Sequence, residues 1–132
     1  MPATWPAVLW GLLILLLTLA PMPETATPGW LQAWHLDKVV HAFLFAVWTV
    51  LVVRAIRRVR GGSAMARHAI AIGILLALLY AGLTELFQEH MSLGRRGDLA
   101  DVAADAAGIL AAAAWLKWAT AAGRAHHKPP AA

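Results

Sequence analysis

The chain has 132 residues, about one domain in length; 61% of them are hydrophobic and only 14% are charged. Soluble proteins carry about 25% charged residues, so the composition favours a fold solvated by lipid. There is no cysteine, which excludes disulfides, cysteine-ligated zinc, iron–sulfur clusters and thiol catalysis. The net charge of +4 does not indicate nucleic-acid binding, because the arginines gather between two apolar segments, at Arg54, Arg57, Arg58, Arg60 and Arg67. That pattern is typical of a membrane topology signal.

Four apolar segments predict four transmembrane helices, over about 4–20, 37–53, 69–87 and 98–122. The first segment is barely long enough to cross a bilayer, and the small residues before Pro21 also resemble the cleavage site of a signal peptide. No Lys or Arg precedes its apolar run, and Pro21 would directly follow the cut. We therefore expect a retained helix.

The loops differ in charge, and this difference predicts the orientation. Residues 21–36 contain no Lys or Arg but carry Trp30 and Trp34, as expected of an outer loop at headgroup level. The arginine-rich stretch 54–67 is expected to be a cytoplasmic loop, and a polar turn is expected over 89–97. The positive charges place both termini inside.

The expected architecture is thus all-α: a four-transmembrane-helix bundle with both termini in the cytoplasm. A single transmembrane domain covers 1–122, and 123–132 is expected to be a flexible cytoplasmic tail. The fourth helix carries small residues four positions apart, at Ala100, Ala104 and Gly108. Such spacing allows neighbouring helix backbones to approach closely.

Polar residues gather near the outer ends of the second, third and fourth helices. Asp98, Asp101 and Asp105 share one stripe of the fourth helix at i, i+3 and i+7. Asp37 and His41 are spaced i, i+4 on the second helix, and Glu85 and Gln88 are spaced i, i+3 on the third. We expect these three stripes to face one pocket.

A purely structural interpretation competes with a functional one. Arg95 or Arg96 could neutralise Asp98, and Lys38 could pair with Glu85, so that the charges only fix helix ends. For any single pair this alternative is as good as a functional role. For the whole set it is weaker, because acids on one stripe repel one another and Asp105 lies nearly two turns into the bilayer.

Each polar residue receives an expected role. Asp37 can orient His41 and raise its basicity, as a carboxylate does for a general base. The candidate catalytic residues are Asp37, His41, Glu85, Asp101 and Asp105. The candidate ligand-binding residues are Lys38, Gln88, Arg95, Arg96 and Asp98. Carboxylates with one histidine would suit Mg²⁺, Mn²⁺ or Ca²⁺ better than a closed zinc site, but no motif specifies a metal or another cofactor.

Over about residues 30–115 the chain resembles the VanZ-like family of small bacterial membrane proteins. The resemblance rests on Asp37-Lys38 with His41, on Glu85 with Gln88, and on the pattern R-x-x-D-x-x-D-x-x-x-D-x-x-G from Arg95 to Gly108. Two features depart from the family pattern: Asn is more usual where Asp105 stands, and either Arg95 or Arg96 can be the matching arginine. The family is named for a protein that lowers sensitivity to the glycopeptide teicoplanin. The resemblance implies a multi-pass protein of the bacterial cytoplasmic membrane.

Three function classes follow. The first is an enzyme or binding module at the outer leaflet that acts on a phosphorylated lipid or cell-wall precursor and thereby affects glycopeptide sensitivity. The second is a non-catalytic envelope protein that binds a partner through the same pocket. The third is a small proton-coupled transporter, which is disfavoured because the inner halves of the helices have no matching polar residues. The expected partners are the bilayer and such a lipid, and no nucleic acid.

Overall fold

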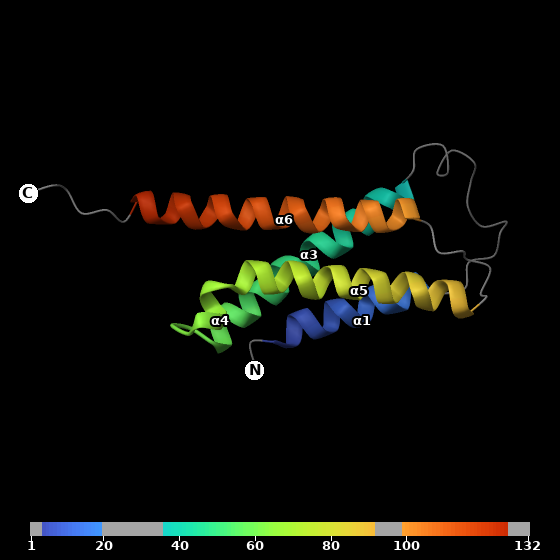
Figure 1. Ribbon diagram of the computed structural model, residues 1–132, viewed down its shortest axis with the longest axis horizontal. Coiled ribbons are helices and arrows are strands. Elements are labelled where there is room, and N and C mark those ends of the chain that lie inside the picture. The colour runs from blue at the N-terminus through green and yellow to red at the C-terminus, as the bar shows by residue number, and fades with distance from the viewer. Residues whose placement is uncertain (1–3, 20–35, 92–98, 127–132) are drawn as a thin grey trace, which may run out of the picture.

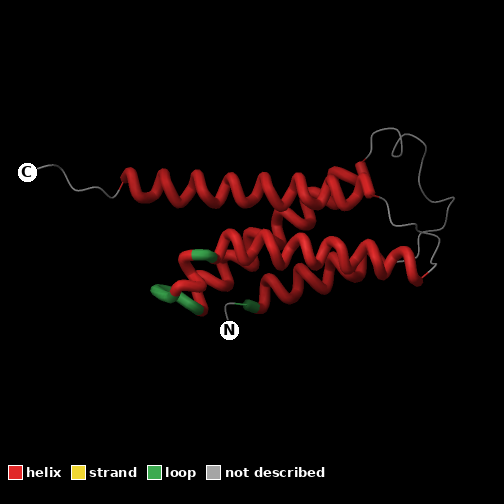
Figure 2. Tube along the Cα trace, in the orientation of Figure 1, coloured by secondary structure: helices red, strands yellow, loops and turns green. Residues whose placement is uncertain are grey.

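The computed structural model describes residues 4–19, 36–91 and 99–126. Within these ranges every regular element is a helix, as Figure 2 shows. The helices are α1 (Trp5–Leu19), α3 (Leu36–Val59), α4 (Ala64–Arg67), α5 (Ala69–Met91) and α6 (Leu99–His126). The four longer helices lie side by side with alternating directions, so that α3 and α6 begin at the end of the bundle where α1 and α5 finish (Figure 1).

Three of these helices are long and apolar enough to cross a membrane: Leu36–Val59, Ala69–His90 and Leu99–Gly123. The fourth, α1, is a shorter apolar helix of 15 residues. Large apolar side chains point outward along all four, among them Leu12 and Leu16 on α1, Leu79 on α5 and Leu110 on α6. Such a surface suits hydrocarbon and not water. The all-α expectation is confirmed for the described residues, and the three long apolar helices suggest a membrane protein.

The helix boundaries differ from the sequence expectation mainly at the arginine-rich end. The second helix was expected to stop at 53, but α3 continues to Val59 and carries Arg54, Arg57 and Arg58. Arginine is a good helix former, so the loss of hydropathy marks the end of the apolar span and not the end of the helix. The expected loop 54–67 is therefore reduced to a turn, in which Gly62 adopts a positive φ of 77°, followed by α4.

The other two long helices also extend beyond the expected ends. The third continues from 87 to Met91, and the fourth reaches His126, four residues into the expected tail. The expected tail therefore starts as helix, and its remainder, 127–132, lies outside the described residues. Most of the expected outer loop 21–36 and of the turn 89–97 also lies outside them.

The tightest helix crossing joins α3 and α6. A Cβ atom at Gly108 would occupy the space of the Ala42 backbone carbonyl, so only glycine allows the two backbones this close. The small-residue spacing on the fourth helix predicted such an approach. The crossing places the first turns of α3 and α6 against each other.

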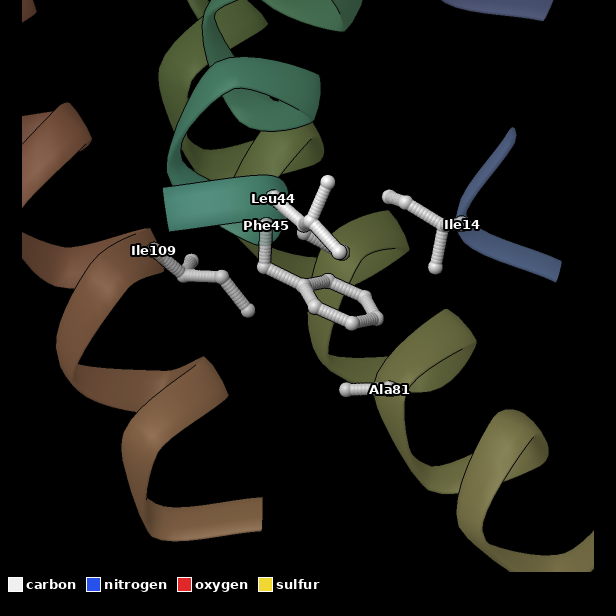
Figure 3. Close-up of a cluster of buried hydrophobic side chains, with 6 residues drawn as sticks. Ile14, Leu44, Phe45, Ala81 and Ile109 are labelled. Carbon is white, nitrogen blue, oxygen red and sulfur yellow. The ribbon is translucent and has the colours of Figure 1, made fainter. Parts of the chain in front are cut away.

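A core of apolar side chains lies in the middle of the bundle. Figure 3 shows Phe45 of α3 between Ile14 of α1, Ala81 of α5 and Ile109 of α6. Phe45, Ile14 and Ile109 have no exposed surface. All four long helices therefore share one core.

Hydrogen bonds to backbone carbonyls attach α1 to its neighbours. Trp10 Nε1 donates to the carbonyl of Leu44 at 2.9 Å, and Trp48 Nε1 donates to the carbonyl of Ala7 at 2.8 Å. The Tyr80 hydroxyl of α5 donates to the carbonyl of Gly11 at 2.6 Å. These bonds fix the register of a short helix that has little length for packing.

Candidate functional site

The candidate site lies at the end of the bundle where α3 and α6 begin and α5 finishes, opposite α4 and the arginines (Figure 1). Its polar side chains occupy two levels. One helical turn separates the levels, a rise of about 5 Å along each helix. The upper level lies nearer the helix ends, and the lower level lies toward the core.

An ion pair between α3 and α6 forms the upper level. Lys38 Nζ lies 2.9 Å from Asp101 Oδ1 and donates a hydrogen bond to it. The Lys38 side chain is 25% exposed and that of Asp101 is 16% exposed. Lys38 Nζ also lies 3.6 Å from Asp37 Oδ2, on a side chain that is 54% exposed. This level therefore holds an accessible cation between two carboxylates.

The lower level is more buried and contains a histidine between acids. His41 Nδ1 of α3 lies 3.2 Å from Asp105 Oδ1 of α6, and Asp105 has no exposed surface. Glu85 of α5 is also buried. The three residues can each offer one ligand atom such that these atoms all lie within 4.8 Å of one another. An imidazole held by a carboxylate has the geometry of a general base.

Apolar residues close the site toward the membrane interior. One turn below His41, Asp105 and Glu85 the same helices present Phe45, Ile109 and Ala81, which meet in the core of Figure 3. The polar stripes therefore end at this apolar layer, which forms the floor of the site. Of the residues that the structure describes as buried, every ionisable one belongs to the lower level of this site.

Gln88 takes a structural contact. Its Nε2 donates to the carbonyl of Thr18 at 2.7 Å, near the end of α1, and its side chain is buried. Neighbouring Thr84 is also buried, and its hydroxyl donates to the carbonyl of Ala81 at 2.8 Å. The amide of Gln88 thus holds α1 against α5, and its expected role in ligand binding stays a prediction.

The structure brings together most of the predicted site residues but pairs them differently. Asp37 was expected to orient His41, yet it lies beside Lys38, and the carboxylate in contact with His41 is that of Asp105. The set expected around one pocket is divided between the two levels. The predicted ligand-binding residues Arg95, Arg96 and Asp98 lie outside the described residues.

A separate apolar groove of about 340 Å³ lies at the opposite end of the bundle. It is formed by the first turn of α1, the last turns of α3 and Met65 of α4, with Val8, Val52, Val59 and Arg60 among its lining residues. Sequence patterns gave no indication of it, because its α1 wall and its α3–α4 wall lie forty or more positions apart in the sequence.

Comparison with known proteins finds no matching family model, and neither a curated protein nor a solved structure is detectably similar to the chain.

Proposed function

We propose that this protein is a VanZ-like envelope protein of the bacterial cytoplasmic membrane whose polar site binds or processes an anionic lipid or cell-wall precursor at the outer leaflet. The observation that carries the proposal is the two-level site itself. An accessible cation lies above a buried histidine–carboxylate group, and an apolar floor closes the site below.

We infer four spans with both termini in the cytoplasm from the distribution of charge. Arg54, Arg57, Arg58, Arg60 and Arg67 all belong to the end of the bundle opposite the site. By the positive-inside rule the arginine end faces the cytoplasm, and the site opens to the outer leaflet. There Lys38 can meet the phosphate of a lipid that enters sideways from the bilayer.

The apolar floor favours binding or chemistry over transport. A proton-coupled carrier needs polar groups that continue toward the other face of the membrane. Below His41 and Asp105 the described helices offer Phe45 and Ile109 instead. A substrate that reaches the lower level must therefore leave by the way it entered.

Lipid retention by the full-length protein tests the proposal. Protein in detergent would be incubated with equimolar polyprenyl phosphate, phosphatidylglycerol and phosphatidylcholine, and retained lipid measured by native mass spectrometry. We expect the two anionic lipids to be retained over phosphatidylcholine. Lys38→Gln should reduce this preference about tenfold, the equivalent of 1.4 kcal/mol for one charge-assisted contact. Equal retention of all three lipids by the wild type would contradict the proposal.

Two further variants separate a binding role of Lys38 from a structural one. The pair Lys38→Gln with Asp101→Asn removes both charges without leaving an unpaired one; it should bind as weakly as Lys38→Gln if the ammonium holds the lipid. Recovery of binding in the double variant would show that the ion pair only holds α3 against α6. Lys117→Gln, an exposed lysine on α6 far from the site, is the matched control.

The same samples distinguish an enzyme from a non-catalytic binding protein. An enzyme would convert the retained phosphorylated lipid to a product of different mass, and His41→Gln would prevent this conversion while retention persisted. Retention without any change in lipid mass indicates the binding protein.

A further inference from the structure

The lower level of the site has the composition of a metal centre. His41, Glu85 and Asp105 come from three different helices, all are buried, and one ligand atom from each lies within 4.8 Å of the others. Three donors around one ion stand about 3 to 3.5 Å apart, since each lies about 2.1 Å from the metal. The 3.2 Å between His41 Nδ1 and Asp105 Oδ1 already fits. The Glu85 oxygen lies within 4.8 Å of both, so a small rotation of its side chain would complete the set.

Asp105 supplies an independent indication that the group has a missing ligand. Its Oδ2 is fully buried and accepts no hydrogen bond from the part of the chain that the structure describes. Leaving a buried carboxylate oxygen without a partner is costly in a bilayer. A buried polar atom of this kind calls for an unseen water or ion.

Charge balance favours a divalent ion over a proton. Two carboxylates and a neutral imidazole carry a charge of −2, which a divalent ion cancels. If His41 were instead protonated, the group would keep a charge of −1 in a medium of low dielectric constant. In the described part of the site the other cation, Lys38, is already paired with Asp101.

We propose that His41, Glu85 and Asp105 bind one divalent first-row transition-metal ion, with Zn²⁺ and Mn²⁺ as the fitting cases. A site with one imidazole and two carboxylates suits these ions, whereas Ca²⁺ takes six to eight oxygen ligands. Three protein ligands leave a coordination position for water or substrate. That position faces the upper level, because Phe45, Ile109 and Ala81 fill the other side. The site stands on its own geometry, whether or not a lipid binds above it.

Metal content is the direct test. The full chain, carrying a non-histidine affinity tag and with tail residues His126 and His127 replaced by Asn, would be loaded with Zn²⁺ or Mn²⁺, desalted and analysed by plasma mass spectrometry. We expect about one ion per chain in the wild-type site. Asp105→Asn, Glu85→Gln and His41→Gln should each lower occupancy at least tenfold. Glu89→Gln, an exposed carboxylate one turn beyond Glu85 on α5, should leave occupancy unchanged.

Co²⁺ substitution keeps the test decisive if the triad variants fail to fold. Visible absorption by Co²⁺ bound to the wild type reports the coordination geometry, and ion-dependent thermal stabilisation reports affinity. Acidification should release the ion, because the ligands must be deprotonated to bind. A wild type that keeps no ion and shows neither absorption nor stabilisation overturns the metal site. Lipid retention is measured separately, so its result is independent of the result for the metal site.

Discussion

Asp105 is a carboxylate with no exposed surface, and it lies in a membrane helix against the imidazole of His41. Its cost depends on what shares the site. A bound ion neutralises the negative charge of Asp105. Without an ion, the buried charge lowers the stability of the fold, and an amide of the same shape would remove this cost. The stability of an Asn variant should therefore depend on metal.

We predict that the Asp105→Asn variant is at least as stable as the wild type without metal and less stable than the wild type with metal. In chelator the variant should unfold at the same or a higher temperature, because the amide removes a buried charge and His41 can remain neutral. With Zn²⁺ at a hundred times its dissociation constant, the wild type should gain about 2.7 kcal/mol and the variant nothing. Tryptophan fluorescence during thermal unfolding measures both; an equal gain in the two proteins would contradict the prediction.

At the level of single residues, the sequence located the polar group but not its pairings. Helical spacing placed Asp101 and Asp105 on one stripe, because that depends only on the helix itself. Which acid meets His41 depends on how closely α3 and α6 cross, and spacing within one helix carries no such information. For the same reason the contact of Gln88 with a carbonyl of α1 was not foreseen.

At the scale of helices, the α3–α6 crossing depends on the missing side chain of Gly108. Gly108→Ala would drive a methyl group into the backbone of Ala42 and should lower the free energy of unfolding by about 3 kcal/mol. Gly82→Ala is the matched control, since nothing lies within 4 Å of its added Cβ. It should be neutral or slightly stabilising. Equal effects of the two substitutions on chemical unfolding in detergent would show that the crossing can relax.

The attachment of α1 gives a second prediction for a helix. Tyr80→Phe removes the hydrogen bond to the Gly11 carbonyl but keeps the ring contacts with Phe45 and Trp48. We expect a loss of about 1 kcal/mol in unfolding free energy. Trp118→Phe, on a side chain that is 68% exposed, should change nothing by the same measurement. A Tyr80→Phe protein as stable as the wild type would mean that apolar packing alone holds α1.

The sequence predicted the positions of the helices, but it predicted their ends only in part. Apolar runs predicted the three long helices because a span must satisfy its backbone internally and stay apolar. Hydropathy stops at Val53, but the hydrogen bonding of α3 continues through Arg57 and Arg58, whose long side chains can reach headgroups. The tryptophan bonds of α1 were not foreseen, because they require knowing which helix lies alongside.

For the whole molecule, the proposed orientation rests on the distribution of charge and can be tested directly. Reporter fusions after Gly62 and after Arg124 should both report a cytoplasmic location, and a fusion after Thr27 an extracytoplasmic one. Replacing Arg57, Arg58 and Arg60 together by Gln should weaken this bias and give mixed signals. An extracytoplasmic reporter at Gly62 in the unaltered chain would invert the protein and turn the site toward the cytoplasm.

The short length of α1 has a consequence for the surrounding lipid. Its 15 residues rise about 22 Å, against about 36 Å for the 24 residues of α3. Hydrocarbon is about 30 Å thick. If α1 crosses the bilayer, as proposed, the membrane becomes thinner on the side of the protein that α1 covers, which Figure 1 shows to be the side away from α6. The deficit falls at the first turn of α1, beside the apolar groove, where acyl chains can fill the gap.

This one-sided mismatch should make stability depend on acyl-chain length. We expect the melting temperature to be higher in phosphatidylcholine bilayers with 14-carbon chains than in those with 20-carbon chains. Inserting four leucines after Leu12 would lengthen α1 by about 6 Å and should move the optimum toward thicker bilayers. A melting temperature independent of chain length in both proteins would show that α1 does not deform the membrane. A thinner bilayer beside α1 would attract lipids with short acyl chains to that side, so that the protein would select the lipids around it.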